Sequence, residues 1–97
     1  MATYINLLRF TQQGIENIKE SPARVETAKK TYEQLGAKVK DFYCVMGQYD
    51  AVLIAEAPDD ETMAKIQLAL GSAGNVRSET LRAFTEDEYR RIVTALP

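Results

Sequence analysis

The sequence contains no histidine and a single cysteine, Cys44, among its 97 residues. Histidine is the usual general base near neutral pH, the commonest metal ligand and a frequent haem ligand, so its absence removes the ordinary routes to these chemistries. One cysteine cannot form an internal disulfide or a thiolate metal cluster. Because no imidazole is present to activate it, Cys44 is expected to be a small buried apolar residue. We therefore expect no metal and no cofactor.

The sequence also has little net charge and no long apolar run. Its 12 Lys and Arg residues and 14 Asp and Glu residues give a formal charge of −2. This balance disfavours nucleic-acid binding, because proteins that bind nucleic acid usually carry a basic stripe. No stretch approaches the roughly 20 apolar residues of a membrane-spanning helix, and MATYINLLRF does not have the pattern of a secretory leader. We expect a cytoplasmic protein that binds neither nucleic acid nor membrane.

The chain has the length and composition of one small domain. It is 45% apolar and 27% charged, which is typical of a globular protein. No linker, repeat or low-complexity stretch divides it, so residues 1–97 are expected to form a single domain. A chain this short buries only roughly two thirds of its unfolded surface, so a partner subunit would add substantially to its stability.

Four segments have the composition of β-strands. Residues 2–10 and 51–57 carry apolar side chains on both alternating sets, which is typical of strands covered on both faces. Residues 37–46 alternate at first and become apolar later, and the turn at 47–50 joins them to the next strand as an antiparallel hairpin. The last strand, 76–84, is more polar, as expected at a sheet edge or a subunit boundary.

Three helices are expected between and after these strands. One runs from Pro22 to Leu35 after a Ser-Pro pair typical of a helix start. A second follows Asp59, whose side chain can cap it, and a third follows a capping box from Thr85 to Glu88. The order β-α-β-β-α-β-α predicts a ferredoxin-like split βαβ fold of the α+β class. This fold has a four-stranded antiparallel sheet with two helices on one face, and here a short C-terminal helix is added.

The two-sided apolar pattern predicts assembly. Two helices can cover only one face of the sheet, yet two of its strands are apolar on both faces. Burying the second face at roughly 25 cal/mol per Å² favours the packing of two sheets, or the closure of a barrel between subunits. We therefore expect a homo-oligomer, either a dimer or a small ring, that forms through the uncovered sheet face.

The turn from Gly47 to Asp50 is a candidate site with two interpretations. In the structural one, Gly47 permits a positive φ, Asp50 binds nearby amides and Tyr49 packs across the hairpin end. In the functional one, Tyr49 and Asp50 project into a pocket, where Tyr49 donates to a small-molecule ligand and Asp50 orients that ligand or accepts a proton.

Other polar residues of the strands also have two interpretations. Arg77 either forms an ion pair between subunits or binds a carboxylate or phosphate, and Arg82 lies on the opposite face of the same strand. Asn6, Asp41, Tyr43 and Glu56 interrupt apolar strands, so they either form a satisfied network or line a cavity. A Glu56 held in an apolar pocket could act as an acid or base. The acidic run at 59–61 is interpreted as helix capping, because it lacks the spaced loop of a calcium site.

Several segments together resemble a known family. The stretch 46–52, Met-Gly-Gln-Tyr-Asp-Ala-Val, is similar to the signature turn of the GYD domain family of small bacterial proteins, with Gln48 inserted after the glycine. Three further segments resemble the pattern of that family: 11–14, 55–61 and 74–84. The resemblance implies a ferredoxin-like domain that associates through its sheet, similar in build to the dimeric α/β-barrel proteins. It brings no catalytic residues with it.

Two functions from different classes remain open. The first is an oligomeric small-molecule-binding or assembly module, because the chain has a clear scaffold but no activated nucleophile, metal set or cofactor motif. The alternative is a cofactor-independent enzyme of the monooxygenase, isomerase or decarboxylase type. It would have a pocket between sheet and helices, and its proton-transferring groups would come from Tyr43, Tyr49, Asp50 and Glu56. No catalytic residue can be assigned from the sequence.

Overall fold

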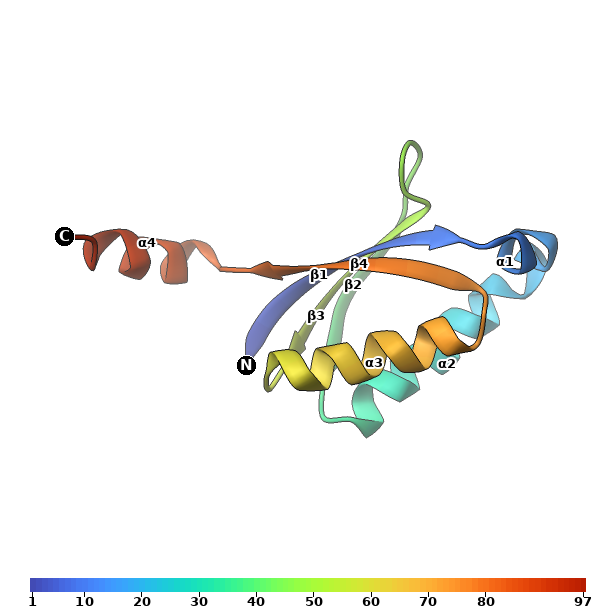
Figure 1. Cartoon of the computed structure of the whole chain (residues 1–97), viewed down its shortest axis with the longest axis horizontal. Coiled ribbons are helices and arrows are strands. Elements are labelled where there is room, and N and C mark those ends of the chain that lie inside the picture. Colours follow the sequence, from blue (N-terminus) through green and yellow to red (C-terminus); the bar gives the residue numbers. More distant parts are fainter.

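The computed structural model describes all of residues 1–97 and has the predicted order of strands and longer helices, with one further short helix after the first strand (Figure 1). The strands are β1 (Ala2–Phe10), β2 (Lys38–Cys44), β3 (Ala51–Ala57) and β4 (Val76–Ala83). The helices are α1 (Gln12–Glu16), α2 (Ser21–Gln34), α3 (Asp60–Ser72) and α4 (Glu86–Thr94). A short 3-10 turn, η1 (Ile18–Glu20), lies between α1 and α2.

The strands form one antiparallel sheet in the order β2-β3-β1-β4, which is the ferredoxin-like arrangement. Its central strand pair places Ile5 of β1 opposite Ile54 of β3, and Leu81 of β4 lies opposite Ile5 on the other side. The hairpin of β2 and β3 is confirmed, and β4 is an edge strand as expected. Helices α2 and α3 both lie on one side of the sheet (Figure 1), so the predicted fold class is confirmed.

Local signals set the helix boundaries. The Asp59 carboxylate accepts from the Thr62 amide at 2.8 Å and begins α3. The predicted capping box begins α4, where the Glu88 amide donates to the Thr85 hydroxyl at 3.2 Å and the Thr85 amide donates to the Glu88 carboxylate at 2.8 Å. Helix α2 starts one residue before the predicted Pro22 and ends before Gly36, whose φ of 84° only glycine adopts without strain.

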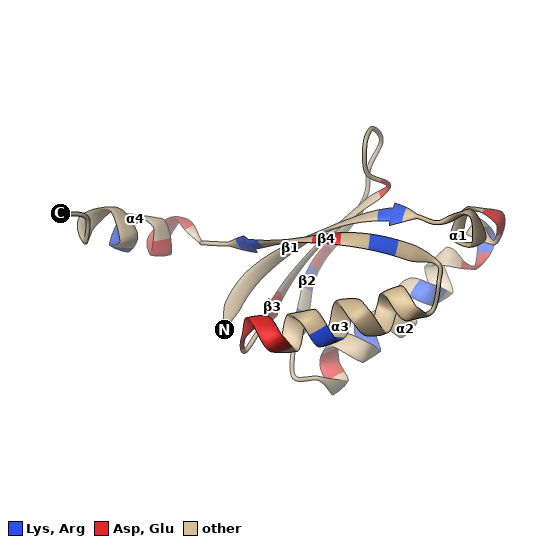
Figure 2. Cartoon of the chain, in the orientation of Figure 1, with Lys and Arg blue, Asp and Glu red and all other residues tan.

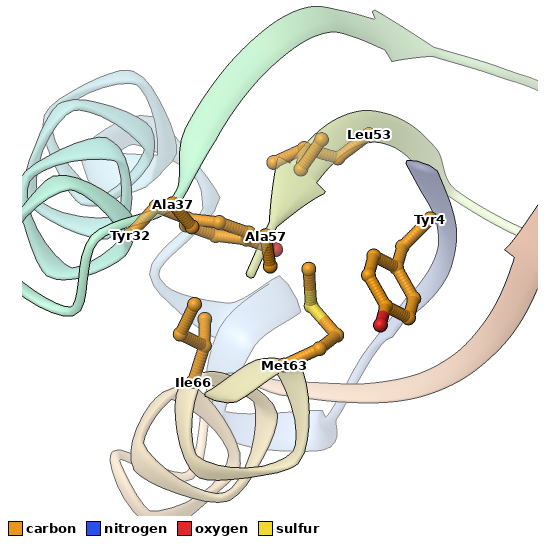
Figure 3. Close-up of a cluster of buried hydrophobic side chains, with 8 residues drawn as sticks. Tyr4, Tyr32, Ala37, Leu53, Ala57, Met63 and Ile66 are labelled. Carbon is orange, nitrogen blue, oxygen red and sulfur yellow. The ribbon is translucent and has the colours of Figure 1, made fainter. Parts of the chain in front are cut away.

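The core lies between the sheet and the two helices (Figure 3). Alternate residues of β1 and β3 point into it, as the period of a strand requires. Its buried members are Tyr4, Tyr32, Ala37, Leu53, Ala55, Ala57, Met63 and Ile66. In the whole chain only 12 of 97 residues are buried. The chain by itself therefore leaves much of its apolar surface uncovered.

Two details of the β2 end differ from expectation. Cys44 is exposed, so the prediction that it is a buried apolar residue is wrong. The reason is its position, because Cys44 is the last residue of an edge strand. Residues 45 and 46 were also expected in the strand, but the strand ends at Cys44 and Met46 is almost fully exposed.

Helix α4 projects away from the rest of the molecule. Strand β4 leads out of the sheet, and α4 lies at one end of the long axis (Figure 1) of a molecule with extents of 51 × 30 × 18 Å. No hydrogen bond or ion pair joins α4 to the other elements. Its apolar stripe is exposed and consists of Tyr89, Ile92, Val93 and Leu96. The chain thus supplies no cover for this stripe.

Candidate functional site

The face of the sheet opposite α2 and α3 carries most of the predicted site residues. The buried set of β1 is Tyr4, Asn6 and Leu8, so Ile5 and Leu7 point to the other side. Strand register places further apolar residues beside these two. Together they form an apolar centre that we call the open face: Ile5, Leu7, Tyr43, Val52, Ile54 and Leu81. None of these six residues is fully buried.

Charged residues of both signs surround this apolar centre. The basic ones are Arg9, Lys38, Lys40 and Arg77, and the acidic ones are Asp41, Glu56 and Glu79. Figure 2 shows both colours distributed along the strands without a large patch of either. A surface with this pattern can meet a copy of itself without strong like-charge repulsion.

Tyr49 belongs to a cluster that crosses the end of the open face. Its hydroxyl donates to Glu79 at 2.9 Å, and the Arg9 guanidinium carbon lies 4.5 Å from the centre of its ring. Arg9 also pairs with Glu79 at 3.5 Å. The hydrogen bond to Glu79 is the main cause that raises the pKa of Tyr49. The cluster ties the β2–β3 loop across β1 to β4.

Asp50 acts on the backbone of the neighbouring strand. Its amide donates to the Leu8 carbonyl at 2.8 Å, and its carboxylate accepts from the Phe10 amide at 2.9 Å. Its carbonyl accepts from the Val45 amide at 3.0 Å. These bonds satisfy polar groups at the end of the sheet ladder, so the structural interpretation accounts for this residue. Gly47 adopts a φ of 122°, as expected for the turn.

The remaining predicted residues also lie on the open face. Tyr43 is 55% exposed, and Arg77 is exposed and makes no ion pair within the chain. Glu56 is half-buried and pairs with Lys40 at 3.7 Å, so it does not sit in an apolar pocket. The structure therefore brings Tyr43, Tyr49, Glu56 and Arg77 to one face, with Asp50 at its end. None of the five lines either of two hollows that lie on the helix side of the sheet.

One of these hollows is a cavity of about 310 Å³ between α2 and the sheet. Eleven of its 15 lining residues are hydrophobic, and Arg24 is its only charged residue. The Arg24 guanidinium donates to the carbonyls of Asn17 at 2.8 Å and Gly14 at 3.2 Å, which fixes its position in the wall. The cavity is where the enzyme alternative expected one, but the side chains proposed to transfer protons are elsewhere.

A buried polar network lies under the helix layer. The Asn6 side chain is fully buried, donates to the Tyr32 hydroxyl at 2.7 Å and accepts from Thr80 at 3.0 Å. Gln67 also donates to the Tyr32 hydroxyl, at 2.9 Å. Burial raises the pKa of Tyr32, and these two donors oppose that shift. Asn6 is thus in a hydrogen-bonded network, one of the two outcomes expected. Gln67 and Thr80 were missed because each resembles an ordinary polar surface residue.

The second hollow is a groove of about 470 Å³ between α3 and β4. Its lining residues are Tyr4, Asp60, Met63, Ala64, Gln67, Leu68, Thr80 and Arg82. The Tyr4 hydroxyl donates to the Asp60 carboxylate. Burial, this hydrogen bond and the nearby negative charge raise the pKa of Tyr4 to about 12, so the hydroxyl keeps its proton at physiological pH.

Two further observations bear on the site chemistry. No three or more His, Cys, Asp or Glu side chains are grouped so that they could hold a metal ion. No helix combines the length and the apolar content needed to cross a membrane.

Comparisons with known proteins agree on the fold. The chain matches the GYD domain family over residues 4–93. A Thermus thermophilus protein named glutamine synthetase and cystathionine beta-lyase binding protein is 37% identical over 84 residues, which are 86% of this chain and 88% of that protein. A crystal structure of a protein from Thermus thermophilus has a TM-score of 0.57 and 28% identity, and the match covers 87% of this chain and 94% of that one.

A second solved structure that this chain resembles is a feast or famine regulatory protein from M. tuberculosis complexed with L-methionine. It has a TM-score of 0.63 and 18% identity over 90% of this chain and 54% of its own. At this level of identity the likeness is one of fold alone. It supports the ferredoxin-like architecture read from the strand order.

Proposed function

The chain belongs to the GYD domain family, and we propose that it is a homo-oligomeric binding module that assembles through the open face of its sheet. The observation that carries this proposal is the uncovered apolar centre defined above. A second copy is the occupant that fits it, because the charged residues around it are mixed in sign and can pair across a twofold axis. We further propose that the assembled module binds a metabolic enzyme.

The extent of burial supports self-assembly. Leu81 of the open face is 48% exposed and Tyr43 is 55% exposed, although both lie beside apolar neighbours. Packing a second sheet against these residues would remove that surface from water at roughly 25 cal/mol per Å². Stacked sheets lie about 10 Å apart, a spacing that interdigitating side chains of this size fill.

Helix α4 supports the same conclusion from outside the sheet. Isolated helices shorter than about 12 residues are marginal in water, and α4 has nine residues. Its stripe is 45% to 63% exposed, so packing within the chain does not stabilise it. We propose that the stripe packs on the second copy, since α4 continues from β4, a strand of the open face.

The enzyme partner is proposed from the family relationship. The Thermus thermophilus relative is named for binding glutamine synthetase and cystathionine beta-lyase, and it aligns with most of this chain. We propose that this chain binds enzymes of the same two kinds. The enzyme alternative for the chain itself gains no support, because the α2 cavity lacks the nominated proton-transferring residues.

Light scattering on a sizing column tests the self-assembly. We expect the wild-type chain to elute as a dimer or a small ring at micromolar concentration. Ile54→Glu places a charge in the open face and should shift the protein to monomer. The matched control is Met46→Glu, which makes the same kind of change at a residue that is 99% exposed, and it should not alter the mass. Circular dichroism checks that both variants are folded. A monomeric wild-type protein would contradict the proposal.

Biolayer interferometry with purified enzymes tests the partner proposal. Glutamine synthetase and cystathionine beta-lyase from the same organism are immobilised in turn, and the full chain is passed over each. We expect saturable binding with a dissociation constant in the micromolar range or tighter. An unrelated enzyme of similar charge serves as the control. Absence of saturable binding to both enzymes would refute this part of the proposal and leave the self-assembly to its own test.

A further inference from the structure

We propose that the groove between α3 and β4 binds a free α-amino acid with an apolar side chain, and that Arg82 pairs with its carboxylate while Asp60 pairs with its ammonium group. This groove faces the helix side of the sheet and is separate from the open face. The proposal therefore does not rest on self-assembly or on the enzyme partner.

The groove holds two opposite charges that have no ionic partner in the chain. Asp60 and Arg82 both border Tyr4, but neither forms an ion pair with the other or with any other residue. The Tyr4 hydroxyl donates to Oδ1 of Asp60, which leaves Oδ2 without a hydrogen-bond partner. The Arg82 guanidinium carbon lies 5.6 Å from the centre of the Tyr4 ring. A ligand that carries both charges can bridge the two groups.

Arg82 is held so that one edge of its guanidinium stays free. Its Nη1 donates to the carbonyls of Thr3 and Ala83, while Nε and Nη2 have no partner in the chain. The Phe84 ring also lies against this group, with its centre 4.5 Å from the guanidinium carbon. Nε and Nη2 form the pair of parallel donors that binds a carboxylate in a bidentate manner.

A third polar group in the groove wall lacks a partner. The Gln67 amide donates to the Tyr32 hydroxyl at 2.9 Å and to the Met63 sulfur at 3.4 Å, but its Oε1 is buried and accepts no hydrogen bond. Buried acceptors in native proteins are nearly always satisfied. Gln67 lines the groove, so this unsatisfied acceptor lies in the groove wall, just beneath the surface that a ligand would contact.

The other residues that line the groove indicate that the side chain of the ligand is apolar. Met63, Ala64 and Leu68 form an apolar wall along α3, and Leu68 is 75% exposed although it borders a concave surface. A volume of about 470 Å³ is within the usual range for small-molecule sites. An aliphatic or thioether side chain would cover this wall. The α2 cavity offers no comparable site, because its one charged group already binds two backbone carbonyls.

Titration calorimetry of the full-length chain tests the proposal with L-leucine and L-methionine as probes. We expect both to bind. Two truncated ligands separate the charges: 4-methylpentanoate keeps the carboxylate and 3-methylbutylamine keeps the amine. Each should bind at least about tenfold more weakly than L-leucine, because each leaves one charged group of the groove unpaired. Equal affinity for L-leucine and 4-methylpentanoate would overturn the role of Asp60.

Substitutions of the two charged groove residues test whether the amino acid binds in this groove. Arg82→Gln and Asp60→Asn should each weaken L-leucine binding by about tenfold or more, since each removes one charge. The control Lys30→Gln removes one positive charge at an exposed position of α2 that lines neither hollow, and it should change the affinity by less than about twofold. Circular dichroism confirms the fold of each variant, and Asp59 keeps its capping role in Asp60→Asn.

The result that overturns the proposal is defined for the wild-type chain. If neither amino acid binds at concentrations up to about 10 mM, the proposed site is refuted, because a dissociation constant above this value is too weak for a specific site. Unchanged affinity in Arg82→Gln would refute it as well. The oligomeric mass is measured in the same samples, so an oligomer that binds no amino acid refutes only this inference. A monomer that does bind one refutes only the self-assembly.

Discussion

The two faces of the sheet are built from the same four strands but differ in how far their apolar side chains are buried. On the covered face, Leu53 and Ala55 of β3 are 3% and 0% exposed beneath α2 and α3. On the open face, Val52 and Ile54 of the same strand are only partly buried, and nothing in the chain lies over them. One run of apolar residues thus has alternate members that bury the core of the chain and alternate members that remain for the assembly we propose.

The helices show the same contrast. Helix α3 buries Met63 and Ile66 against the sheet, whereas α4 buries none of its residues. Both begin with a side-chain cap, so their starts are equally well specified. The difference lies in what their apolar stripes meet. We interpret α3 as part of the folded chain and α4 as part of the assembled protein.

The neighbouring residues Leu53 and Ile54 give the largest expected effect. Leu53→Ala removes a buried core side chain and should lower the free energy of unfolding by about 3 kcal/mol at any protein concentration. Ile54→Ala should destabilise the protein more where the oligomer is present, because its side chain is only partly buried in one chain and assembly would complete its burial. Thermal unfolding at several concentrations separates the two. A concentration-independent effect of Ile54→Ala would erase the proposed difference between the faces.

Much of this contrast was predictable, because strand alternation and turn residues are local signals. The doubly apolar strands, the hairpin and the terminal capping box all follow from residues close together in sequence. The exposure of Cys44 was not predictable, because it depends on β2 being an edge strand. The groove was missed for a related reason: Tyr4, Asp60 and Arg82 meet only when β1 pairs with β4 and α3 packs beside them.

Gly14 tests the close packing at the end of the covered side. A β-carbon on this residue would lie 2.1 Å from the Asn75 carbonyl oxygen, a backbone atom that cannot rotate away. Gly14→Ala should therefore lower the free energy of unfolding by about 2 kcal/mol. The control Gly71→Ala adds the same methyl group where no atom lies within 4 Å, so it should not destabilise the protein. Equal melting temperatures for the two variants would contradict this packing.

The cap of α3 should contribute a smaller, pH-dependent effect. Hydrogen bonds from Thr62 lower the pKa of Asp59 below its ordinary 3.8. The folded state therefore favours the charged carboxylate, and its stabilisation is complete above pH 3.8 and is lost as the pH falls through the lower folded value. Asp59→Ala should lower the melting temperature at pH 7, and the difference from wild type should shrink at low pH. A difference that grows with acid would contradict this sign.

Tyr49→Phe should have the smallest effect. It removes the hydrogen bond to Glu79 but keeps the ring beside Arg9, at an exposed position. The melting temperature should change by no more than about 2 °C. Calorimetry and light scattering on this variant also separate the two interpretations of the turn. Loss of ligand binding or of assembly would favour the functional interpretation, whereas unchanged behaviour would favour the structural one.

The most direct measurement is the sedimentation mass of the wild-type chain across a dilution series in the micromolar range. A protein whose open face and α4 stripe are covered by further copies should have a mass of at least twice the 10.9 kDa of one chain, and this mass should fall on dilution or in Ile54→Glu. A mass of 10.9 kDa at every concentration would show that the open face meets water, and the account would be wrong at its centre.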